Sequence, residues 1–460
     1  MYLRSIEIKN VKCFADLTLS FVKNGTVRKW TVLLGQNGLG KSTLLQTMAA
    51  ALAGPSSLRE LLPVAEGWVK RNAPYGEITA ELEWTKGDAQ LPRWPKKTPY
   101  TCRYVVTGDP DKIPKGVSDP PSVPAIVDWA GPGSGKAREK INKEMNRLKK
   151  TAYAEGQPGW LACGYGPFRR LSGGSQDADH ILYSGRKAAR FVTLFREDAA
   201  LTNATKWLID LHNTAREGDN DNQRALDIVK AAFETNLLPE PATLVVDARS
   251  ANLRIAGGQT IQFQHLSDGY RSMLALGIDL LRWLIAAFPN DPSQATRPGV
   301  VLIDELDAHL HPIWQQRIGG WLQEKFPELQ FIIASHSPFL AQVATETGGN
   351  IVLVREGTNV EARKDLATVG TWRADQILTE LFGLESTRSP EVQRKLKQFL
   401  RLAAKKKKQP LSSQEQMDFQ HLELFYESVP PSIEDPSERG VVEALKDAVS
   451  SHSDELSKVE

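Results

Sequence analysis

Residues 35–43 read Gly-Gln-Asn-Gly-Leu-Gly-Lys-Ser-Thr, which matches the phosphate-binding pattern Gly-x-x-x-x-Gly-Lys-[Ser/Thr]. An apolar stretch, Trp30–Leu34, precedes this loop, and a segment with the apolar spacing of a helix, Ser42–Ala53, follows it. The motif needs that context, because the strand delivers the loop and the helix N-terminus brings a positive dipole end to the phosphates. The stretch therefore predicts a strand–loop–helix unit that binds a nucleotide.

The residue types within the loop predict a role for each position. Glycine lets the backbone approach a ligand closely, so the N–H groups of Gly38, Gly40 and Lys41 should surround the phosphates. The ammonium of Lys41 should reach the β- and γ-phosphates, and the hydroxyl of Ser42 should ligate Mg²⁺. With ATP and Mg²⁺ as the predicted cofactors, the nucleotide-binding residues expected in this loop are Gly35, Asn37, Gly38, Gly40, Lys41, Ser42 and Thr43.

A second motif, residues 300–305, reads Val-Val-Leu-Ile-Asp-Glu, an apolar strand that ends in two acids and has the Walker B form. Such a strand would deliver Asp304 to the Mg²⁺ ion, so Ser42 and Asp304 are the predicted metal ligands. Glu305 could deprotonate a water in line with the γ-phosphate, a general-base contribution typically worth about 10²–10⁴ in rate. The predicted catalytic residues are Glu305, Lys41 and, from a later motif, His336.

Residues 266–270, Leu-Ser-Asp-Gly-Tyr, open a long segment of helical periodicity and resemble the ABC-type signature Leu-Ser-Gly-Gly-Gln. In that superfamily the Ser and Gly at this helix start contact the γ-phosphate bound by a second subunit, which is anion binding at a helix N-terminus. The resemblance implies that Ser267 and Gly269 contact nucleotide in trans. Asp268 and Tyr270 depart from the pattern, and Asp268 adds negative charge near a phosphate.

Two further motifs follow the Walker B strand. Residues 306–312, Leu-Asp-Ala-His-Leu-His-Pro, resemble a D-loop, which implies that Asp307 lies near the dimer interface and binds nucleotide there. Residues 335–338, Ser-His-Ser-Pro, resemble the switch-histidine segment, in which His336 can donate to the γ-phosphate. The i, i+2 spacing of the two histidines in the first segment suits neither one helix face nor a zinc pattern, so it does not favour a metal site there.

Composition is that of an ordinary soluble protein, and 460 residues are enough for two or three domains. The net charge is +2, so any nucleic-acid site must be a local patch. Three cysteines, Cys13, Cys102 and Cys163, form no Cys-x-x-Cys pair and are typical of buried thiols in a reducing compartment. No stretch approaches about 18 apolar residues, and the N-terminus lacks an apolar leader. We therefore expect a cytoplasmic protein with no membrane contact.

The order of strand and helix patterns predicts an α/β fold, a P-loop NTPase of the ABC-ATPase type that resembles SMC and RecF heads. We expect a mixed β-sheet with helices, an antiparallel β subdomain, a helical insertion and a C-terminal helical extension. The expected organisation is an N-terminal ATPase lobe at 1–54, an insertion with a Pro-rich excursion and a helical region at 55–245, a C-terminal lobe at 246–375, a basic helical region for partner binding at 376–430 and an acidic mobile tail at 431–460.

Other segments allow more than one interpretation. The basic stretches 136–150 and 391–408 fit either a solvated helix face or a contact with nucleic acid or a partner. Residues 171–176, Leu-Ser-Gly-Gly-Ser-Gln, look like a signature, but no long amphipathic helix pattern starts there. Residues 131–136 resemble a second phosphate loop with one residue too few between the glycines. Arg169 is a candidate contact on the nucleotide side.

The motifs occur in ABC order, and the chain resembles particular branches of that superfamily. Residues 6–14, Ile-Glu-Ile-Lys-Asn-Val-Lys-Cys-Phe, resemble the opening of RecF/SMC/OLD proteins, where this turn lies near the adenine, which implies a nucleotide contact by Lys12. Residues 299–341 resemble the AAA-type ATPases of bacterial defence systems. Residues 372–390 resemble the PtuA ATPases of the Septu antiphage systems and retron-associated relatives, which implies an HNH nuclease partner of the PtuB type.

The sequence thus predicts an ATP-binding and ATP-hydrolysing subunit of an antiphage defence complex, which dimerises around ATP and controls an associated HNH nuclease. Self-association would give an even oligomer, with nucleic acid reached through the complex. Two alternatives stay open. A RecF-like DNA-repair ATPase would bind DNA in a salt-sensitive way through 136–150 or 391–408. A nucleotide-held, non-hydrolysing scaffold would bind ATP with negligible turnover and would tolerate Glu305→Gln.

Overall fold

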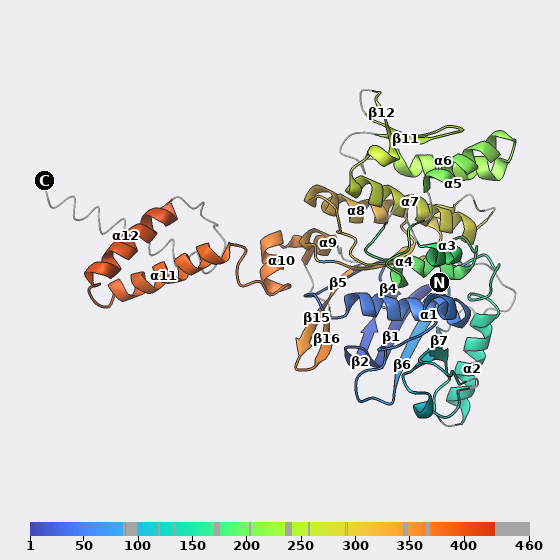
Figure 1. Ribbon diagram of the computed structural model, residues 1–460, viewed down its shortest axis with the longest axis horizontal. Coiled ribbons are helices and arrows are strands. Elements are labelled where there is room, and N and C mark those ends of the chain that lie inside the picture. The colour runs from blue at the N-terminus through green and yellow to red at the C-terminus, as the bar shows by residue number, and fades with distance from the viewer. Residues whose placement is uncertain are drawn as a thin grey trace. The chain divides into compact units, whose positions relative to one another are not determined.

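The structure is a computed structural model that describes residues 1–85, 88, 99–117, 120–132, 134–169, 175–201, 204–234, 242–255, 258–289, 291, 293–343, 348–364 and 369–427. The chain falls into two compact units, Met1–Ile377 and Leu378–Glu460 (Figure 1). All of the predicted nucleotide motifs lie in the first unit. Within the described ranges, no helix is both long enough and apolar enough to cross a membrane.

A six-stranded sheet in the first unit carries the phosphate loop. Its strand order is β16-β15-β5-β14-β13-β9, and every neighbouring pair is parallel except β15 with β16. The strands are β5 (Trp30–Leu34), β9 (Leu161–Tyr165), β13 (Gly299–Ile303), β14 (Leu329–Ala334), β15 (Gly349–Glu356) and β16 (Asn359–Lys364). β5, β9, β13 and β14 are buried along their whole length, as apolar runs in a parallel sheet covered on both faces should be.

The register of this sheet brings the ends of the motif-bearing strands together. Ile303 at the end of β13 pairs with Tyr165 of β9, and Ala334 at the end of β14 pairs with Leu33 of β5. The chain leaves β5 into the phosphate loop, β13 into the two Walker B acids and β14 into the switch-histidine segment. Ligands of parallel α/β sheets bind outside the carboxyl ends of the strands, so this edge is the expected site.

Helices cover both faces of the six-stranded sheet. Helix α1 (Lys41–Leu61) shares an apolar core with a second sheet and with alternate residues of β13 and β14, such as Val300 and Ile332. Helices α7 (Asp268–Ala287) and α8 (Pro312–Lys325) lie on the opposite side from α1 (Figure 1). The helix that follows the phosphate loop is therefore held between two sheets.

The second sheet is antiparallel, with the order β2-β1-β6-β7-β8. Its strands are β1 (Tyr2–Val11), β2 (Phe14–Ser20), β6 (Tyr75–Glu83), β7 (Tyr100–Thr107) and β8 (Ile126–Asp128). Helix α2 (Lys136–Lys149) packs on it, and its buried Glu144 accepts a hydrogen bond from Thr101 N at 2.8 Å. Residues expected within an insertion at 55–245 thus complete this sheet and also supply β9, because backbone pairing joins them to β1 and β13.

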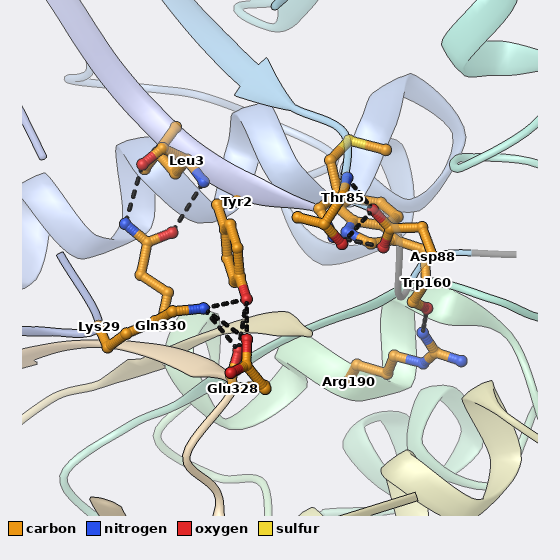
Figure 2. A network of polar contacts seen from close by, with 10 residues as sticks. Tyr2, Leu3, Lys29, Thr85, Asp88, Trp160, Arg190, Glu328 and Gln330 are labelled. Atoms are coloured by element: carbon orange, nitrogen blue, oxygen red, sulfur yellow. Dashed lines mark hydrogen bonds and ion pairs between the residues drawn. The ribbon is translucent and has the colours of Figure 1, made fainter. Parts of the chain in front are cut away.

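Side chains from both sheets meet at the end of the six-stranded sheet remote from the phosphate loop. The amide of Gln330, at the start of β14, accepts from Leu3 N and donates to Leu3 O, both at 2.8 Å. Beside it, Lys29 and Tyr2 contact the carboxylate of Glu328 (Figure 2). Because Gln330 is fully buried, its paired amide replaces backbone pairing and ties the two sheets together.

The remaining elements of the first unit surround these layers. Helices α5 (Ala204–Arg216) and α6 (Asn220–Phe233) pair with each other and lead into a small sheet of β10 (Thr243–Val246), β11 (Ala251–Arg254) and β12 (Thr260–Gln262). The shorter elements are β3 (Val22–Lys23), β4 (Thr26–Val27), η1 (Pro110–Lys112), α3 (Gln176–Leu182), η2 (Lys187–Phe191), α4 (Val192–Phe195), η3 (Phe263–His265), η4 (Gln294–Thr296), α9 (Pro338–Gln342) and η5 (Val369–Thr371).

Beyond α10 (Ala374–Glu380), the second unit is helical, with α11 (Pro390–Lys406) packed on α12 (Ser413–Glu427). Phe399 and Phe419 stack at a centroid distance of 5.0 Å in its small apolar core. The predicted α/β fold, with a mixed sheet, an antiparallel subdomain, helices inserted between β9 and β10 and a helical extension, is confirmed. The predicted acidic tail at 431–460 lies outside the described residues.

Candidate nucleotide site

The phosphate loop joins β5 to α1 in a conformation that needs its glycines. Gly38 and Gly40 have φ of 77° and 83°, in the left-handed region. A Cβ on Gly40 would lie 2.5 Å from the Sγ of Cys13 and 2.9 Å from the ring of Phe14. No side chain caps the start of α1, so its first N–H groups face the loop in the way an anion site requires.

The side chain of Lys41, at the start of α1, is fixed by hydrogen bonds to the phosphate loop. Its ammonium donates to Gly35 O at 2.9 Å and to Gln36 O at 3.1 Å, and only 7% of the residue is exposed. Burial lowers the pKa of Lys41, while the carboxylates of Asp304, Glu305 and Asp307 oppose that shift. A phosphate would offer this ammonium a charged acceptor in place of two carbonyls.

A cavity of about 500 Å³ opens at this edge of the sheet and collects residues from four separate segments. The phosphate loop, the turn between β1 and β2, the end of β13 and the end of β14 all contribute. The lining residues are Lys12, Cys13, Asn37, Gly38, Gly40, Lys41, Ser42, Thr43, Asp304, Glu305 and His336. The fold therefore brings together most of the predicted nucleotide, metal and catalytic residues.

Asp304 meets the requirement for a Mg²⁺ ligand. It is 3% exposed, and among the residues that the structure describes its Oδ1 has no hydrogen-bond partner. Burial raises the pKa of its carboxyl, an effect opposed by the Ser42 hydroxyl, Lys41 and Arg169. No group of three or more His, Cys, Asp or Glu that could hold a metal occurs in the described ranges.

Glu305 has a strained backbone. Its φ is 48°, a left-handed conformation that costs an L-residue about 1–2 kcal/mol. Arg169 supports that conformation through its guanidinium, which donates to Asp304 O and Glu305 O at 2.9 Å each and to Gly166 O at 3.2 Å. Arg169 is not among the residues that line the cavity, and its hydrogen bonds go to backbone carbonyls.

Asp307 orders the switch-histidine segment within the same chain. Its carboxylate accepts from Ser335 Oγ at 2.6 Å and from His336 N at 3.4 Å. Burial lowers the pKa of His336, and the nearby Lys41 ammonium lowers it further, so the imidazole is neutral at pH 7. The D-loop resemblance assigned Asp307 to nucleotide binding near an interface, and its contact with the switch-histidine segment was not visible in the sequence.

The signature residues lie apart from this cavity. Ser267 is the exposed N-cap of α7, and neither it nor Gly269 is among the lining residues. A Cβ on Gly269 would lie 2.8 Å from His309 O, so the helix start packs closely on the D-loop. Asp268 forms an ion pair with Arg271, which offsets the negative charge noted in the sequence.

Lys12 lies in the cavity wall but is turned onto a neighbouring aromatic ring. Its ammonium stands 4.3 Å from the centroid of the Trp68 ring, and its φ is 48°. Burial lowers its pKa.

Of the two D-loop histidines, His311 caps α8 by accepting from Ile313 N at 3.4 Å. The signature-like sequence at 171–176 lies largely outside the described residues.

Two family models match the chain. The AAA domain described as a putative AbiEii toxin of a Type IV toxin–antitoxin system matches residues 169–341, and a second AAA domain matches residues 5–73. These two ranges contain the phosphate loop, the signature-like segment, the Walker B strand and the switch histidine. Together the two matches cover every segment that contributes to the cavity.

Curated relatives include Septu and retron proteins. Septu protein PtuA of Bacillus mycoides (strain KBAB4) is 25% identical over 84% of this chain and 45% of its own length. The probable ATPase of retron Ec83 from Escherichia coli is 35% identical over 33% of this chain and 25% of its own length. Septu protein PtuA of Bacillus thuringiensis is 33% identical over 28% of this chain and 34% of its own length. The match spans less than half the length of each of these relatives.

Solved structures with a similar arrangement are SMC heads. The SMC head bound to the C-terminal winged-helix domain of ScpA has a TM-score of 0.49 and 17% identity, covering 81% of this chain and all of that one. The SMC head domain from Thermotoga maritima has a TM-score of 0.42 and 13% identity, covering 80% and 100%. Since these likenesses are distant, the fold assignment depends on the sheet order and the position of the phosphate loop.

Proposed function

We propose that the chain, which is similar to Septu PtuA and retron ATPase proteins and matches two AAA domain models, binds ATP with Mg²⁺ in the cavity beside the phosphate loop and hydrolyses it. One observation carries the proposal. The buried and unsatisfied oxygen of Asp304 shares a cavity with Ser42, Lys41, Glu305 and His336. A cation and a charged phosphate chain are the ligands that such a set of donors and acceptors can satisfy together.

The residues then have distinct tasks in hydrolysis. The N–H groups of the phosphate loop hold the phosphates, and Lys41 moves from carbonyl oxygens to phosphate oxygens. Ser42 and Asp304 hold Mg²⁺, which when bound neutralises phosphate charge. Glu305 accepts a proton from water as the water oxygen bonds to the γ-phosphorus and the bond from that phosphorus to the bridging oxygen breaks. His336, neutral at pH 7, donates to the γ-phosphate.

We propose further that two copies of the chain enclose the nucleotides. Ser267 and Gly269 lie at the start of α7, a 20-residue helix, yet neither lines the cavity of its own chain. A helix N-terminus with an exposed serine suits a phosphate presented by a second copy. Such an isologous arrangement would contain two composite sites and make an even oligomer.

The Septu and retron relatives support a setting in antiphage defence, and we propose that setting for the chain. ATP binding would then change the state of the complex and control an associated HNH nuclease of the PtuB type. The helical region 376–430, which includes α11 and α12, is the proposed contact for that partner. Nucleic acid would be reached through the complex.

Steady-state ATP hydrolysis tests the enzymatic part of the proposal. Wild-type chain should turn over ATP, and Glu305→Gln should lose about 10²–10⁴ of the rate while still binding ATP. Glu324→Gln is the matched control, because Glu324 lies on the exposed face of α8. Equal rates in wild type and Glu305→Gln would refute the role of Glu305. ATP binding without turnover in either would favour a scaffold.

Mixing two inactive variants tests the composite sites. Lys41→Ala removes the phosphate-loop ammonium, and Ser267→Arg blocks the start of α7, so each variant alone should be inactive. In an equal mixture, half of the dimers would contain one subunit of each variant. In such a dimer, the phosphate loop of the Ser267→Arg subunit and the signature of the Lys41→Ala subunit form one intact site of the two. The expected activity is about a quarter of wild type for independent sites. No recovery on mixing, with both variants folded, would argue against nucleotide shared between copies.

A line of cations along α11 and just beyond its end allows the DNA-repair alternative to be tested. Arg394, Arg401 and Lys408 recur every seven residues, and all three are exposed. Replacing all three by Glu should weaken any DNA binding and reduce the salt slope by about 0.9 for each phosphate that is no longer neutralised. DNA-stimulated hydrolysis that is present in wild type and absent from this variant would favour a RecF-like role.

A further inference from the structure

We propose that Arg169 is a positioning residue that holds the backbone of Glu305 so that the Glu305 carboxylate faces the cavity. This inference extends the proposed function, since it takes Glu305 as the general base. It concerns a residue on a different segment, which follows β9 and reaches a strand end 135 positions further along the chain.

The contacts of Arg169 are concentrated on one short stretch of backbone. Its Nη1 donates to Asp304 O at 2.9 Å and to Gly166 O at 3.2 Å, and its Nη2 donates to Glu305 O at 2.9 Å and to Leu306 O at 3.4 Å. The residue is 6% exposed. A planar guanidinium can satisfy several carbonyls in fixed geometry, which a lysine ammonium cannot match.

These contacts act on the two torsion angles that aim the Glu305 side chain. The carbonyls of Asp304 and Glu305 belong to the peptide groups on either side of the Glu305 Cα. Fixing both peptide planes fixes φ and ψ between them, and so fixes the direction of the Cα–Cβ bond. Glu305 has φ of 48°, a region that L-residues leave unless the surroundings hold them there.

Arg169 acts through Glu305 and not through the nucleotide. It does not line the cavity, and its donors are directed to carbonyl oxygens. Its anchor is also rigid, because a Cβ on Gly166 would overlap Thr193 O, which shows how closely that turn packs on α4. Burial lowers the pKa of Arg169 to about 10, so the guanidinium remains charged at neutral pH.

Arg169→Gln tests the proposal, with Arg190→Gln as its matched control. Arg190 is another buried arginine that donates to a carbonyl, Trp160 O at 3.1 Å, but this carbonyl lies just before β9 and not in the Walker B turn. Arg169→Gln should lower kcat by between about tenfold and a hundredfold and leave the Kd for ATP within about threefold. Arg190→Gln should have the kcat of the wild type when it is assayed below the melting temperature of the variant.

Amide exchange gives a readout that does not depend on turnover. Ala308 N donates to Glu305 O at 2.9 Å, so loosening Glu305 should expose that amide. Arg169→Gln should speed exchange across residues 304–310, and Arg190→Gln should leave those residues unchanged. Unchanged exchange in Arg169→Gln, or equal kcat losses in the two variants, would overturn the proposal, as would a large loss of ATP affinity with kcat intact.

A double variant separates this proposal from the proposed function. If Arg169 acts through Glu305, then Arg169→Gln combined with Glu305→Gln should be no slower than Glu305→Gln alone. Multiplied losses would overturn the positioning role while leaving Glu305 as the base. Absence of ATP turnover in the wild type would instead refute the proposed function. Faster amide exchange of residues 304–310 in Arg169→Gln would then still support the proposal that Arg169 fixes the backbone of Glu305.

Discussion

The carboxylate of Asp304 is the proposed Mg²⁺ ligand, but its burial without a metal lowers the stability of the folded chain. Its carboxyl is buried, its pKa is raised by that burial, and its Oδ1 lacks a partner within the described residues. The ionised form is therefore less favourable in the folded chain than in the unfolded chain, and this cost is present above the folded pKa. We expect Asp304→Asn to stabilise the nucleotide-free protein by about 1 kcal/mol, measured by denaturant unfolding, and to abolish Mg²⁺-dependent hydrolysis.

A second buried aspartate serves as the comparison for that variant. Asp279 on α7 is also 3% exposed, but Arg282 lies 3.6 Å from its carboxylate. Asp279→Asn should destabilise the protein, because it weakens an ion pair with a desolvated partner. If both substitutions destabilise, then the surroundings of Asp304 support its charge and its burial carries no net cost.

Cys13 offers a native probe of nucleotide binding. It lines the cavity and is half-buried, whereas Cys102 and Cys163 are fully buried. We expect a maleimide to modify Cys13 alone, and ATP at ten times its Kd to slow the reaction about tenfold. Burial raises the pKa of the Cys13 thiol, so the rate should continue to rise with pH beyond the point at which an exposed cysteine levels off.

The phosphate-loop lysine provides the control for that experiment. Lys41→Ala should remove most ATP protection while leaving the rate without ATP unchanged, since the Lys41 ammonium is directed to the carbonyls of Gly35 and Gln36. Protection that persists in Lys41→Ala would place ATP elsewhere. Modification of either buried cysteine at the same rate would show that the fold opens on the timescale of the reaction.

The start of α7 depends on a close contact with the D-loop. A Cβ on Gly269 would lie 2.8 Å from His309 O, and a backbone atom cannot move aside as a side chain can. Gly269→Ala should therefore cost about 1–3 kcal/mol in stability and should impair hydrolysis in mixtures where it supplies the signature. Gly320→Ala on α8, where a Cβ meets nothing within 4 Å, should instead stabilise by about 0.5–1 kcal/mol.

The division of the chain into two units has a consequence for truncation. Every residue that lines the cavity, and both signature residues, belong to Met1–Ile377. A chain that ends at Glu385, and so retains α10, should bind and hydrolyse ATP within about twofold of the full chain, because its apolar core is intact. The measurement is steady-state hydrolysis together with a melting curve. Loss of folding in the shorter chain would show that the helical unit is needed for stability.

Local motifs were readable in the sequence because short-range geometry specifies them. The phosphate loop requires glycine at positive φ within a strand–loop–helix unit, and the Walker B acids must follow a buried apolar strand. Each requirement is met within about ten residues, so residue type and spacing carry it. The apolar strands β5 and β13, the long helix α7 and the fold class follow from patterns that are equally local.

Tertiary structure alone decided which of these pieces meet. Strand pairing assigns β6, β7 and β8 to the antiparallel sheet and places β9 beside β13, and the fold gathers the loop, Asp304 and His336 around one cavity. The hold of Arg169 on Glu305 is equally invisible in sequence. The physical reason is that these links use backbone carbonyls and N–H groups, which nearly every residue type provides, so only the folded path of the chain selects among them.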